Sequence, residues 1–99
     1  VAGIKVVYDK ARGPYERIID LKVICQACNI PRYEPIVNSK YYKIILPEYL
    51  ALGGDEFTMI PKYSRNTIIG GRDIDALVEY VQKMSPINLP PLRGRITFV

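Results

Sequence analysis

Pro47 and the glycine pair Gly53 and Gly54 constrain the fold of this chain more than any other residues. Proline has no amide donor, so it ends the hydrogen-bond ladder of a strand, whereas glycine accepts positive φ and allows a sharp reversal. We therefore expect an apolar strand over residues 41–46, one helical turn over residues 48–52 and a tight turn at the glycines.

The same stretch places an aromatic ring, Tyr49, shortly before a carboxylate, Asp55. An aromatic face can stack on a nucleobase, and a carboxylate can accept hydrogen bonds from ribose hydroxyls. The pair therefore suits a nucleoside. On pattern alone, the structural interpretation is the stronger one: a strand-to-helix connection that ends on a glycine turn.

The composition is that of a globular protein, with 48% hydrophobic and 24% charged residues among 99. A chain of this length makes at most one domain. No apolar run approaches the roughly 18 residues of a membrane-spanning helix, so no span is expected. The net charge of +4 is spread along the chain. Nucleic acid is therefore not an expected partner, although a basic surface attracts small anions such as nucleotides.

The chain contains no histidine and only two cysteines. This composition excludes Ser-His and Cys-His catalysis and removes the commonest metal ligand. Two cysteines also cannot complete a four-ligand zinc site. We therefore expect neither catalysis nor a metal cofactor within this chain itself.

Alternation and turn residues predict the remaining strands. Residues 3–8 and 17–24 are rich in β-branched residues, and the Gly-Pro turn between them predicts an antiparallel hairpin. Residues 32–40 are expected to form a polar connection, residues 57–60 a short strand and residues 61–71 a loop.

The clearest helix is predicted over Asp73–Met84, where apolar residues recur at helical spacing. Asp73 or Arg72 is expected to open the helix. Asp73 is a good N-cap, and Ser85 followed by Pro86 ends the helix. A closing strand is expected over residues 95–99. The apolar stripe of the helix consists of Ile74, Leu77, Val78, Val81 and Met84.

The predicted order, β-β-β-turn-β-α-β, defines an α+β fold with a mixed, mainly antiparallel sheet and one long covering helix. One helix covers at most one face of a sheet, and the other face needs a second layer or water. Strand-like sequence also begins at the first residues, without a visible leader. We therefore expect the fold to be incomplete, as a fragment or as a chain with a partner.

Cys25 and Cys28 directly follow the second predicted strand, and three interpretations are open. A thioredoxin-like redox pair needs a helix at this point, which Pro31 disfavours. Half of a zinc knuckle would lack two ligands. A disulfide closing a tight loop requires an oxidising compartment. This disulfide is the favoured interpretation, and it would stabilise the fold by about 2 kcal/mol.

Residues 53–57 spell GGDEF, the signature string of diguanylate cyclases. Members of that family also need an upstream aspartate for the metal and an Arg-x-x-Asp pattern just before the motif. The only such pattern here, at residues 17–20, lies far upstream. We interpret the match as a coincidence.

Six ordered landmarks resemble the C-terminal domain of secreted 5′-nucleotidases and apyrases, and together they cover nearly all of the chain. The resemblance is strongest to the animal ecto-5′-nucleotidases. The landmarks are residues 3–9 (GIKVVYD), Cys25 with Cys28, residues 42–47 (YKIILP), Tyr49-Leu50-Ala51 before Gly53-Gly54-Asp55, the helix Asp73–Met84, and Gly94-Arg95-Ile96 with Phe98.

The resemblance implies that residues 1–99 are the second half of a nucleoside-binding C-terminal domain. Tyr49 would stack on the base, with adenine expected, and Asp55 would hold the ribose hydroxyls on the turn made by Gly53 and Gly54. An N-terminal domain with two divalent metals, usually zinc, would hydrolyse the phosphate. That domain is not in this chain, so we expect weak nucleoside binding here and the rest of a parent protein, or a partner chain, beside it.

The resemblance further implies secretion and a local disulfide between Cys25 and Cys28. Two positions depart from the family pattern: Tyr49 stands where phenylalanine is common, and Glu56 follows Asp55 where glycine is usual. Tyrosine still stacks, but the Glu56 carboxylate adds like charge beside Asp55.

Two functions follow from this pattern. The chain is the substrate-binding part of a secreted nucleotide hydrolase, or it is a non-catalytic secreted protein that reuses the domain to bind host or partner molecules. A salivary relative from a blood-feeding arthropod would be an example of the second. The presence of a metallophosphoesterase domain upstream of these residues in the natural protein would distinguish the two.

Overall fold

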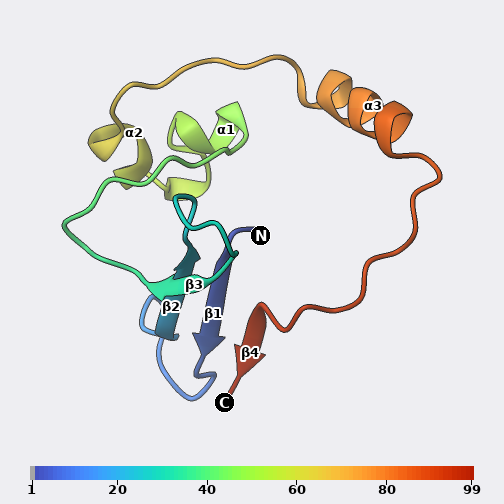
Figure 1. Cartoon of the computed structure of the whole chain (residues 1–99). Helices are drawn as coiled ribbons and strands as arrows, with labels where there is room; N and C mark the ends of the chain where they lie inside the picture. Colours follow the sequence, from blue (N-terminus) through green and yellow to red (C-terminus); the bar gives the residue numbers. More distant parts are fainter. Residues whose placement is uncertain (1) are drawn as a thin grey trace. The chain divides into compact units, whose positions relative to one another are not determined.

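The computed structural model describes residues 2–99 and divides them into two compact units (Figure 1). The sheet unit consists of the described residues up to Tyr41 together with Pro90–Val99. The helical unit consists of Tyr42–Leu89. The sheet unit therefore joins the two ends of the sequence, and the helical unit is inserted between them.

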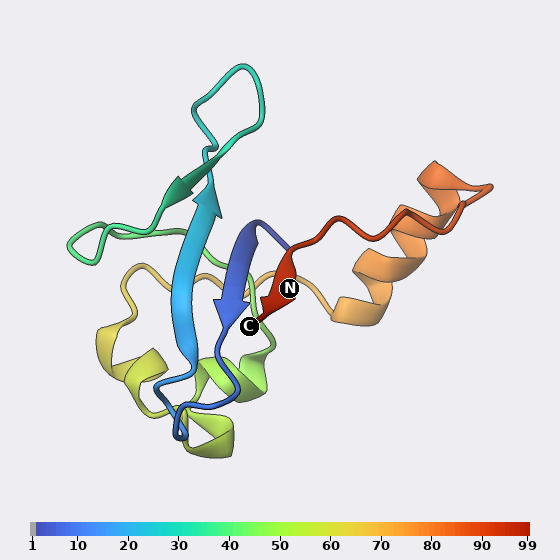
Figure 2. The same cartoon turned by 90° about the horizontal axis from the view of Figure 1, so that it is seen from below.

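Four strands form the sheet, in the order β3-β2-β1-β4. They are β1 (Ile4–Tyr8), β2 (Ile18–Ile24), β3 (Tyr33–Pro35) and β4 (Ile96–Phe98). β1 pairs antiparallel with β2 and parallel with β4, and β2 pairs antiparallel with β3. Figure 2 shows β1 lying between β2 and β4. The predicted hairpin, the closing strand and the mixed, mainly antiparallel sheet are confirmed.

Val6 is the buried centre of this sheet, with 2% of its surface exposed. It lies opposite Leu21 on β2 and opposite Ile96 on β4. Its amide donates a hydrogen bond to the Arg95 carbonyl at 2.8 Å. Among residues 2–99, no other side chain is buried to this degree. The sheet therefore depends on one apolar position and on backbone pairing along both sides of β1.

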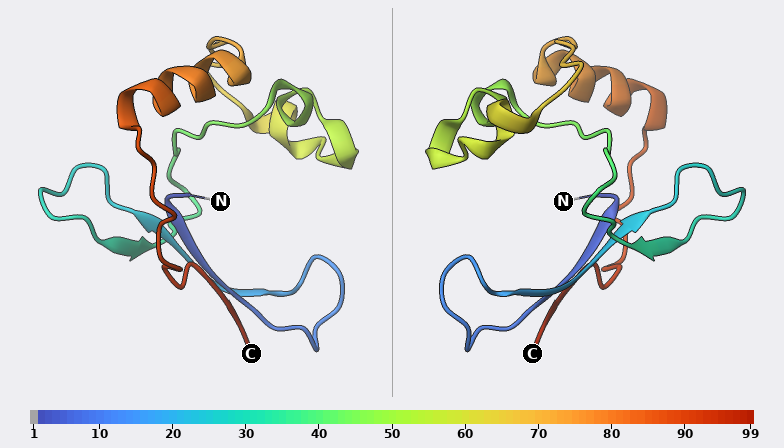
Figure 3. Two further views of the ribbon diagram at one scale, coloured as in Figure 1. Left: turned by 90° about the vertical axis from the view of Figure 1, so that its right-hand side faces the viewer. Right: turned by 90° about the vertical axis from the view of Figure 1, so that its left-hand side faces the viewer.

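Two loops leave opposite ends of the sheet (Figure 3). The β1–β2 loop closes where the Asp9 amide donates to the Arg17 carbonyl at 2.8 Å. The β2–β3 loop closes where the Cys25 amide donates to the Arg32 carbonyl, also at 2.8 Å. Each loop is thus fixed at its base by a backbone hydrogen bond that continues the strand pairing.

The helical unit begins with a helical turn set by Pro47. The φ of Pro47 is −62°, and its carbonyl accepts hydrogen bonds from the amides of Leu50 and Ala51 at 3.1 Å. The predicted turn after Pro47 is therefore confirmed. The elements of this unit are α1 (Glu48–Ala51), the 3-10 turn η1 (Gly54–Glu56), α2 (Met59–Tyr63) and α3 (Asp73–Met84).

The long helix α3 has the bounds expected from its periodicity. Of the two residues expected to open it, Arg72 is the N-cap, and the Asp73 carboxylate accepts a hydrogen bond from the Ile74 amide at 2.7 Å. The helix and the sheet belong to different units, so the covering role of α3 stays a prediction. Within residues 2–99, no helix is both long enough and apolar enough to span a bilayer.

Two predicted strands are wrong. Residues 41–46 form no strand: the run is apolar, but it pairs with none of the four observed strands, and a strand requires such a partner. The strand expected over residues 57–60 is replaced by α2, whose third residue is Pro61. Proline fits the first turn of a helix because the amide that it lacks has no helical partner there. The loop expected over residues 61–71 therefore begins only after α2.

The polar connection expected over residues 32–40 instead contains β3. Its register pairs Ile24 with Tyr33, Val23 with Glu34 and Lys22 with Pro35. A three-residue edge strand is held by backbone pairing more than by side-chain burial. The polar sequence of this segment therefore did not indicate a strand. The observed order is β-β-β, α1, η1, α2, α3, β4.

Replacing Val6 with alanine should lower the free energy of unfolding by about 2 kcal/mol, because buried methyl groups are lost and a cavity remains. Val99→Ala is the matched control, since the Val99 side chain is 69% exposed. The control should change stability by less than about 0.5 kcal/mol. Chemical denaturation of both variants measures the difference, and equal losses would contradict the central role of Val6.

Candidate functional site

Tyr49 and Asp55, the predicted base-stacking and ribose-binding residues, are brought into direct contact. The Tyr49 hydroxyl donates a hydrogen bond to Asp55 Oδ1 at 2.9 Å. The same hydroxyl oxygen accepts a hydrogen bond from the Asp55 backbone amide at 3.2 Å. The Tyr49 side chain on α1 is therefore tied twice to the residue that follows the glycine pair.

The glycines are required by this arrangement for two different reasons. Gly53 has a φ of 94°, in the left-handed region that glycine enters without penalty. At Gly54, a Cβ would lie 2.5 Å from Cε1 and Cζ of the Tyr49 ring and 2.6 Å from the Tyr49 carbonyl oxygen. Gly53 thus allows the chain to reverse, and Gly54 leaves room for the ring.

The two acidic residues after the glycines also occupy the left-handed region, with φ of 53° at Asp55 and 64° at Glu56. Both side chains are exposed, and the Tyr49 side chain is 62% exposed. Left-handed backbone costs an ordinary residue about 1–2 kcal/mol. The two hydrogen bonds with Tyr49 offset this free-energy cost at Asp55. Glu56 stands where the resembled family usually has glycine, and glycine would adopt this backbone conformation without strain.

The site formed by Tyr49, the two glycines and Asp55 is therefore an exposed aromatic ring beside an exposed carboxylate on a fixed turn. The tyrosine hydroxyl engages one carboxylate oxygen, Oδ1. The ring can offer a face for stacking, and the carboxylate can accept further hydrogen bonds. We name this arrangement the Tyr-Asp turn. Sequence spacing predicted that its members lie near one bend, but it did not predict the hydrogen bonds between them.

Cys25 and Cys28 form a disulfide, with their Cα atoms 5.6 Å apart, in the loop between β2 and β3. No helix follows Cys25, so the structure departs from the thioredoxin-like arrangement. The covalent link bridges the base of the loop next to the hydrogen bond between the Cys25 amide and the Arg32 carbonyl.

The described residues do not fit a catalytic metal centre. Among them, the one cluster with metal-ligand types is Cys25, Cys28 and Glu34. Its two sulfur atoms are bonded to each other, and the Glu34 carboxylate pairs with the Arg32 guanidinium at 3.0 Å. Zinc binds cysteine as the thiolate, so this cluster offers no thiolate ligand in the disulfide state.

A second cluster was missed at the sequence level. Tyr8, Lys10, Arg17 and Phe98 line a pocket in the sheet unit. The signal for it is topological, because β1 and β4 are almost ninety residues apart in sequence yet pair in parallel, with Tyr8 opposite Phe98. Periodicity within either segment does not reveal that pairing.

Comparison with known proteins identifies related chains. The family model described as the 5′-nucleotidase C-terminal domain matches residues 1–62. A 5′-nucleotidase of Rattus norvegicus is 46% identical over 98 residues, which is 99% of this chain and 17% of that protein. A snake venom 5′-nucleotidase of Macrovipera lebetinus is 40% identical over 100% of this chain and 24% of that protein.

An apyrase of Tabanus yao is 39% identical over 100% of this chain and 18% of its own length. This chain therefore spans roughly a sixth to a quarter of the relatives that it matches. The crystal structure of a 5′-nucleotidase precursor from Thermus thermophilus matches 99% of this chain and 18% of its own, with a TM-score of 0.82 and 22% identity. That match shows that the fold is shared.

Replacing Gly54 with alanine should lower the free energy of unfolding by about 1–3 kcal/mol, the usual range for overpacking, because the new Cβ collides with the Tyr49 ring and carbonyl. The Tyr49 ring resonances should shift in the NMR spectrum. Gly70→Ala is the control, since no atom lies within 4 Å of a Cβ built there. A Gly54→Ala variant as stable as the Gly70→Ala variant would contradict the close approach.

Replacing Glu56 with glycine should raise the free energy of unfolding by about 1 kcal/mol, because the left-handed cost of an ordinary residue is removed. Glu56→Ala removes the carboxylate but keeps a Cβ, and it should leave stability nearly unchanged. Denaturant titration of both variants separates backbone strain from charge. Equal stabilisation by both would assign the effect to the charge instead.

Proposed function

Because this chain belongs to the family of 5′-nucleotidase C-terminal domains, we propose that it is the nucleoside-binding portion of a secreted 5′-nucleotidase or apyrase-like protein. The observation that carries the proposal is the Tyr-Asp turn, in which an exposed ring and an exposed carboxylate are held together by the hydroxyl bond of 2.9 Å. Its chemistry matches the two halves of a nucleoside, a planar base and a diol.

Each residue of the Tyr-Asp turn has a distinct role in the proposal. The Tyr49 ring stacks on the base, with adenine as the expected base, and the Asp55 carboxylate accepts hydrogen bonds from the ribose hydroxyls. Gly53 and Gly54 supply the reversal and the space that hold the two side chains in contact. This chain binds and orients the nucleoside and takes no part in bond breaking.

Two divalent metals of the zinc type, held by an N-terminal domain, would supply the phosphate chemistry. The described residues do not fit such a centre, because Cys25 and Cys28 are joined to each other. Hydrolysis of nucleotides is therefore proposed for a longer protein that contains these residues. The relatives are named as 5′-nucleotidases and an apyrase. None of these names favours the non-catalytic alternative.

We further propose that residues 1–99 are the second half of the C-terminal domain and pack against the rest of a parent protein or a partner chain. Large apolar side chains without cover support this: Ile45 is 100% exposed, Leu89 96% and Leu92 102%. Soluble proteins seldom leave many such side chains in water when no interface uses them. Secretion is supported by the Cys25–Cys28 disulfide and by relatives named as venom proteins.

The energies of the two contacts predict weak binding by this chain alone. One base stacked on an aromatic ring contributes about 1–3 kcal/mol, and hydrogen bonds to a charged group contribute roughly 1.5–3 kcal/mol. After the cost of association, this corresponds to a millimolar dissociation constant at best. Tight binding requires further contacts from outside these residues.

In the natural protein that carries these residues, Asp55→Asn should raise KM for AMP by about 10–100-fold, because hydrogen bonds from the ribose to a charged acceptor are weakened. Asp75→Asn on α3 is the control, since Asp75 is an exposed carboxylate in the first turn of the helix. Initial-rate kinetics with AMP measure the effect. An unchanged KM for the Asp55→Asn variant would refute ribose binding by Asp55.

Mass and N-terminal sequence of the same protein establish whether a metallophosphoesterase domain precedes these residues.

A further inference from the structure

The pocket of the sheet unit combines two aromatic rings with two cationic side chains. Tyr8 ends β1 and Phe98 ends β4, and the parallel register places them opposite each other. Their ring centroids are 5.7 Å apart, with 25° between the ring planes. At this separation no third ring fits between them, so a ligand must lie against the pair from outside.

Lys10 and Arg17 come from the two ends of the β1–β2 loop. Lys10 Nζ lies 4.3 Å from the centroid of the Phe98 ring, a cation–π distance. Arg17 Nε donates a hydrogen bond to the Arg12 carbonyl at 3.1 Å. Neither contact neutralises the positive charge of Lys10 or Arg17, and both residues line the same pocket as the aromatic pair.

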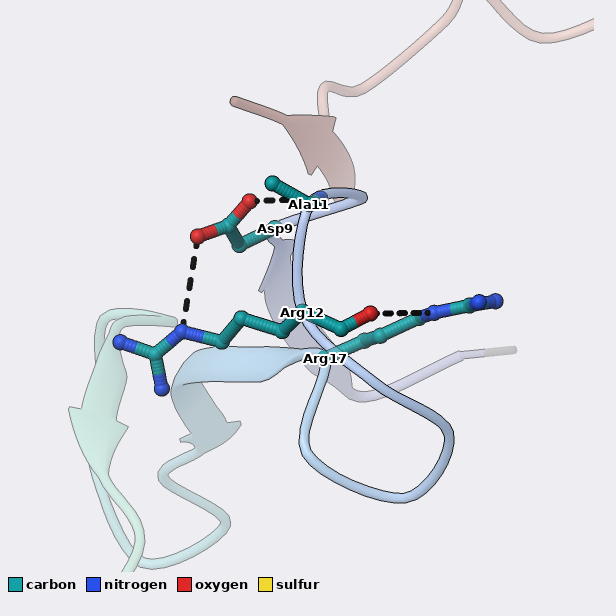
Figure 4. A network of polar contacts seen from close by, with 4 residues as sticks. All are labelled: Asp9, Ala11, Arg12 and Arg17. Atoms are coloured by element: carbon teal, nitrogen blue, oxygen red, sulfur yellow. Dashed lines mark hydrogen bonds and ion pairs between the residues drawn. The ribbon is translucent and has the colours of Figure 1, made fainter.

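The acidic groups of the loop do not pair with these two cations. The Asp9 carboxylate accepts from the Ala11 amide at 2.9 Å and pairs with Arg12 Nε at 3.4 Å. Figure 4 shows this network, with the guanidinium groups of Arg12 and Arg17 directed to opposite sides of the loop. The exposed Glu16 precedes Arg17 and makes no ion pair with it, and none of the ion pairs in the described part of the chain includes Lys10 or Arg17.

This arrangement offers cationic groups for an anion and aromatic side chains for a ring in one pocket. A guanidinium whose Nε is held by a backbone carbonyl still presents its terminal N–H groups, whose planar geometry suits a phosphate or sulfate oxygen pair. A lysine ammonium nearby adds a second, compact positive charge. Aromatic side chains beside them favour a planar ring on the ligand over a bare anion.

We propose that Tyr8, Lys10, Arg17 and Phe98 form a binding site for a small ring-bearing phosphate or sulfate ester. The anionic group contacts Lys10 and Arg17, and the ring lies against Tyr8 and Phe98. The site belongs to the sheet unit, whereas the Tyr-Asp turn belongs to the helical unit.

NMR titration of the ¹⁵N-labelled chain with four probes tests the proposal. Phenyl phosphate and phenyl sulfate carry both features, inorganic phosphate lacks the ring, and phenol lacks the charge. Phenyl phosphate or phenyl sulfate should shift the amides of residues 8–17 and 96–99, and the stronger of the two identifies the ester. Inorganic phosphate and phenol should each bind at least about tenfold more weakly, because each lacks one of the two contacts.

The double variant Lys10→Gln, Arg17→Gln should weaken phenyl phosphate binding by about tenfold or more, since charge-assisted hydrogen bonds are lost. The matched control is Lys22→Gln, Arg32→Gln, which removes two cations of the same unit that already pair with Asp20 and Glu34. A conservative variant, Lys10→Arg, keeps both charges and the Arg17 guanidinium, and it should retain binding. Unchanged binding in the glutamine variant would overturn the proposal. Equal binding of inorganic phosphate would overturn it too, as would the absence of shifts at these amides with every probe.

Discussion

Backbone pairing along both edges of β1 is the interaction on which the sheet unit depends. β2 pairs with one edge and β4 with the other, although β4 comes from the far end of the sequence. Val6 is buried because it lies between these two neighbours, opposite Leu21 and Ile96. The parallel pairing with β4 also brings Phe98 beside Tyr8, so the aromatic pair is a consequence of the same register.

The Tyr-Asp turn depends on a different and more local constraint. Gly54 leaves room for the Tyr49 ring, and the hydroxyl of that ring then reaches Asp55 across six residues. No long-range strand pairing is needed for this geometry. It follows that the candidate nucleoside site is encoded within residues 47–56, whereas the pocket at Tyr8 and Phe98 requires both ends of the chain.

This difference explains which features could be predicted from the sequence. The β1–β2 hairpin, the turn after Pro47 and helix α3 are local, and their residue patterns predicted them. Two of the failures concern pairing partners: residues 41–46 are apolar but pair with no strand, and the polar β3 pairs with β2. Likewise, spacing placed Tyr49 near Asp55, but hydrogen bonds depend on side-chain direction, which spacing does not determine.

The tyrosine at position 49 has a physical meaning that stacking alone does not explain. Phenylalanine would stack on a base as well, but only a hydroxyl can donate to Asp55 Oδ1 and accept from the Asp55 amide. These bonds hold Asp55 in a left-handed conformation, with φ of 53°, which is otherwise less favourable than right-handed backbone. The hydroxyl also occupies one of the carboxylate oxygens that a ribose would use. In the proposed nucleoside complex, Tyr49 would therefore fix the carboxylate in place and at the same time compete with the ribose for it, a balance that a phenylalanine would not create.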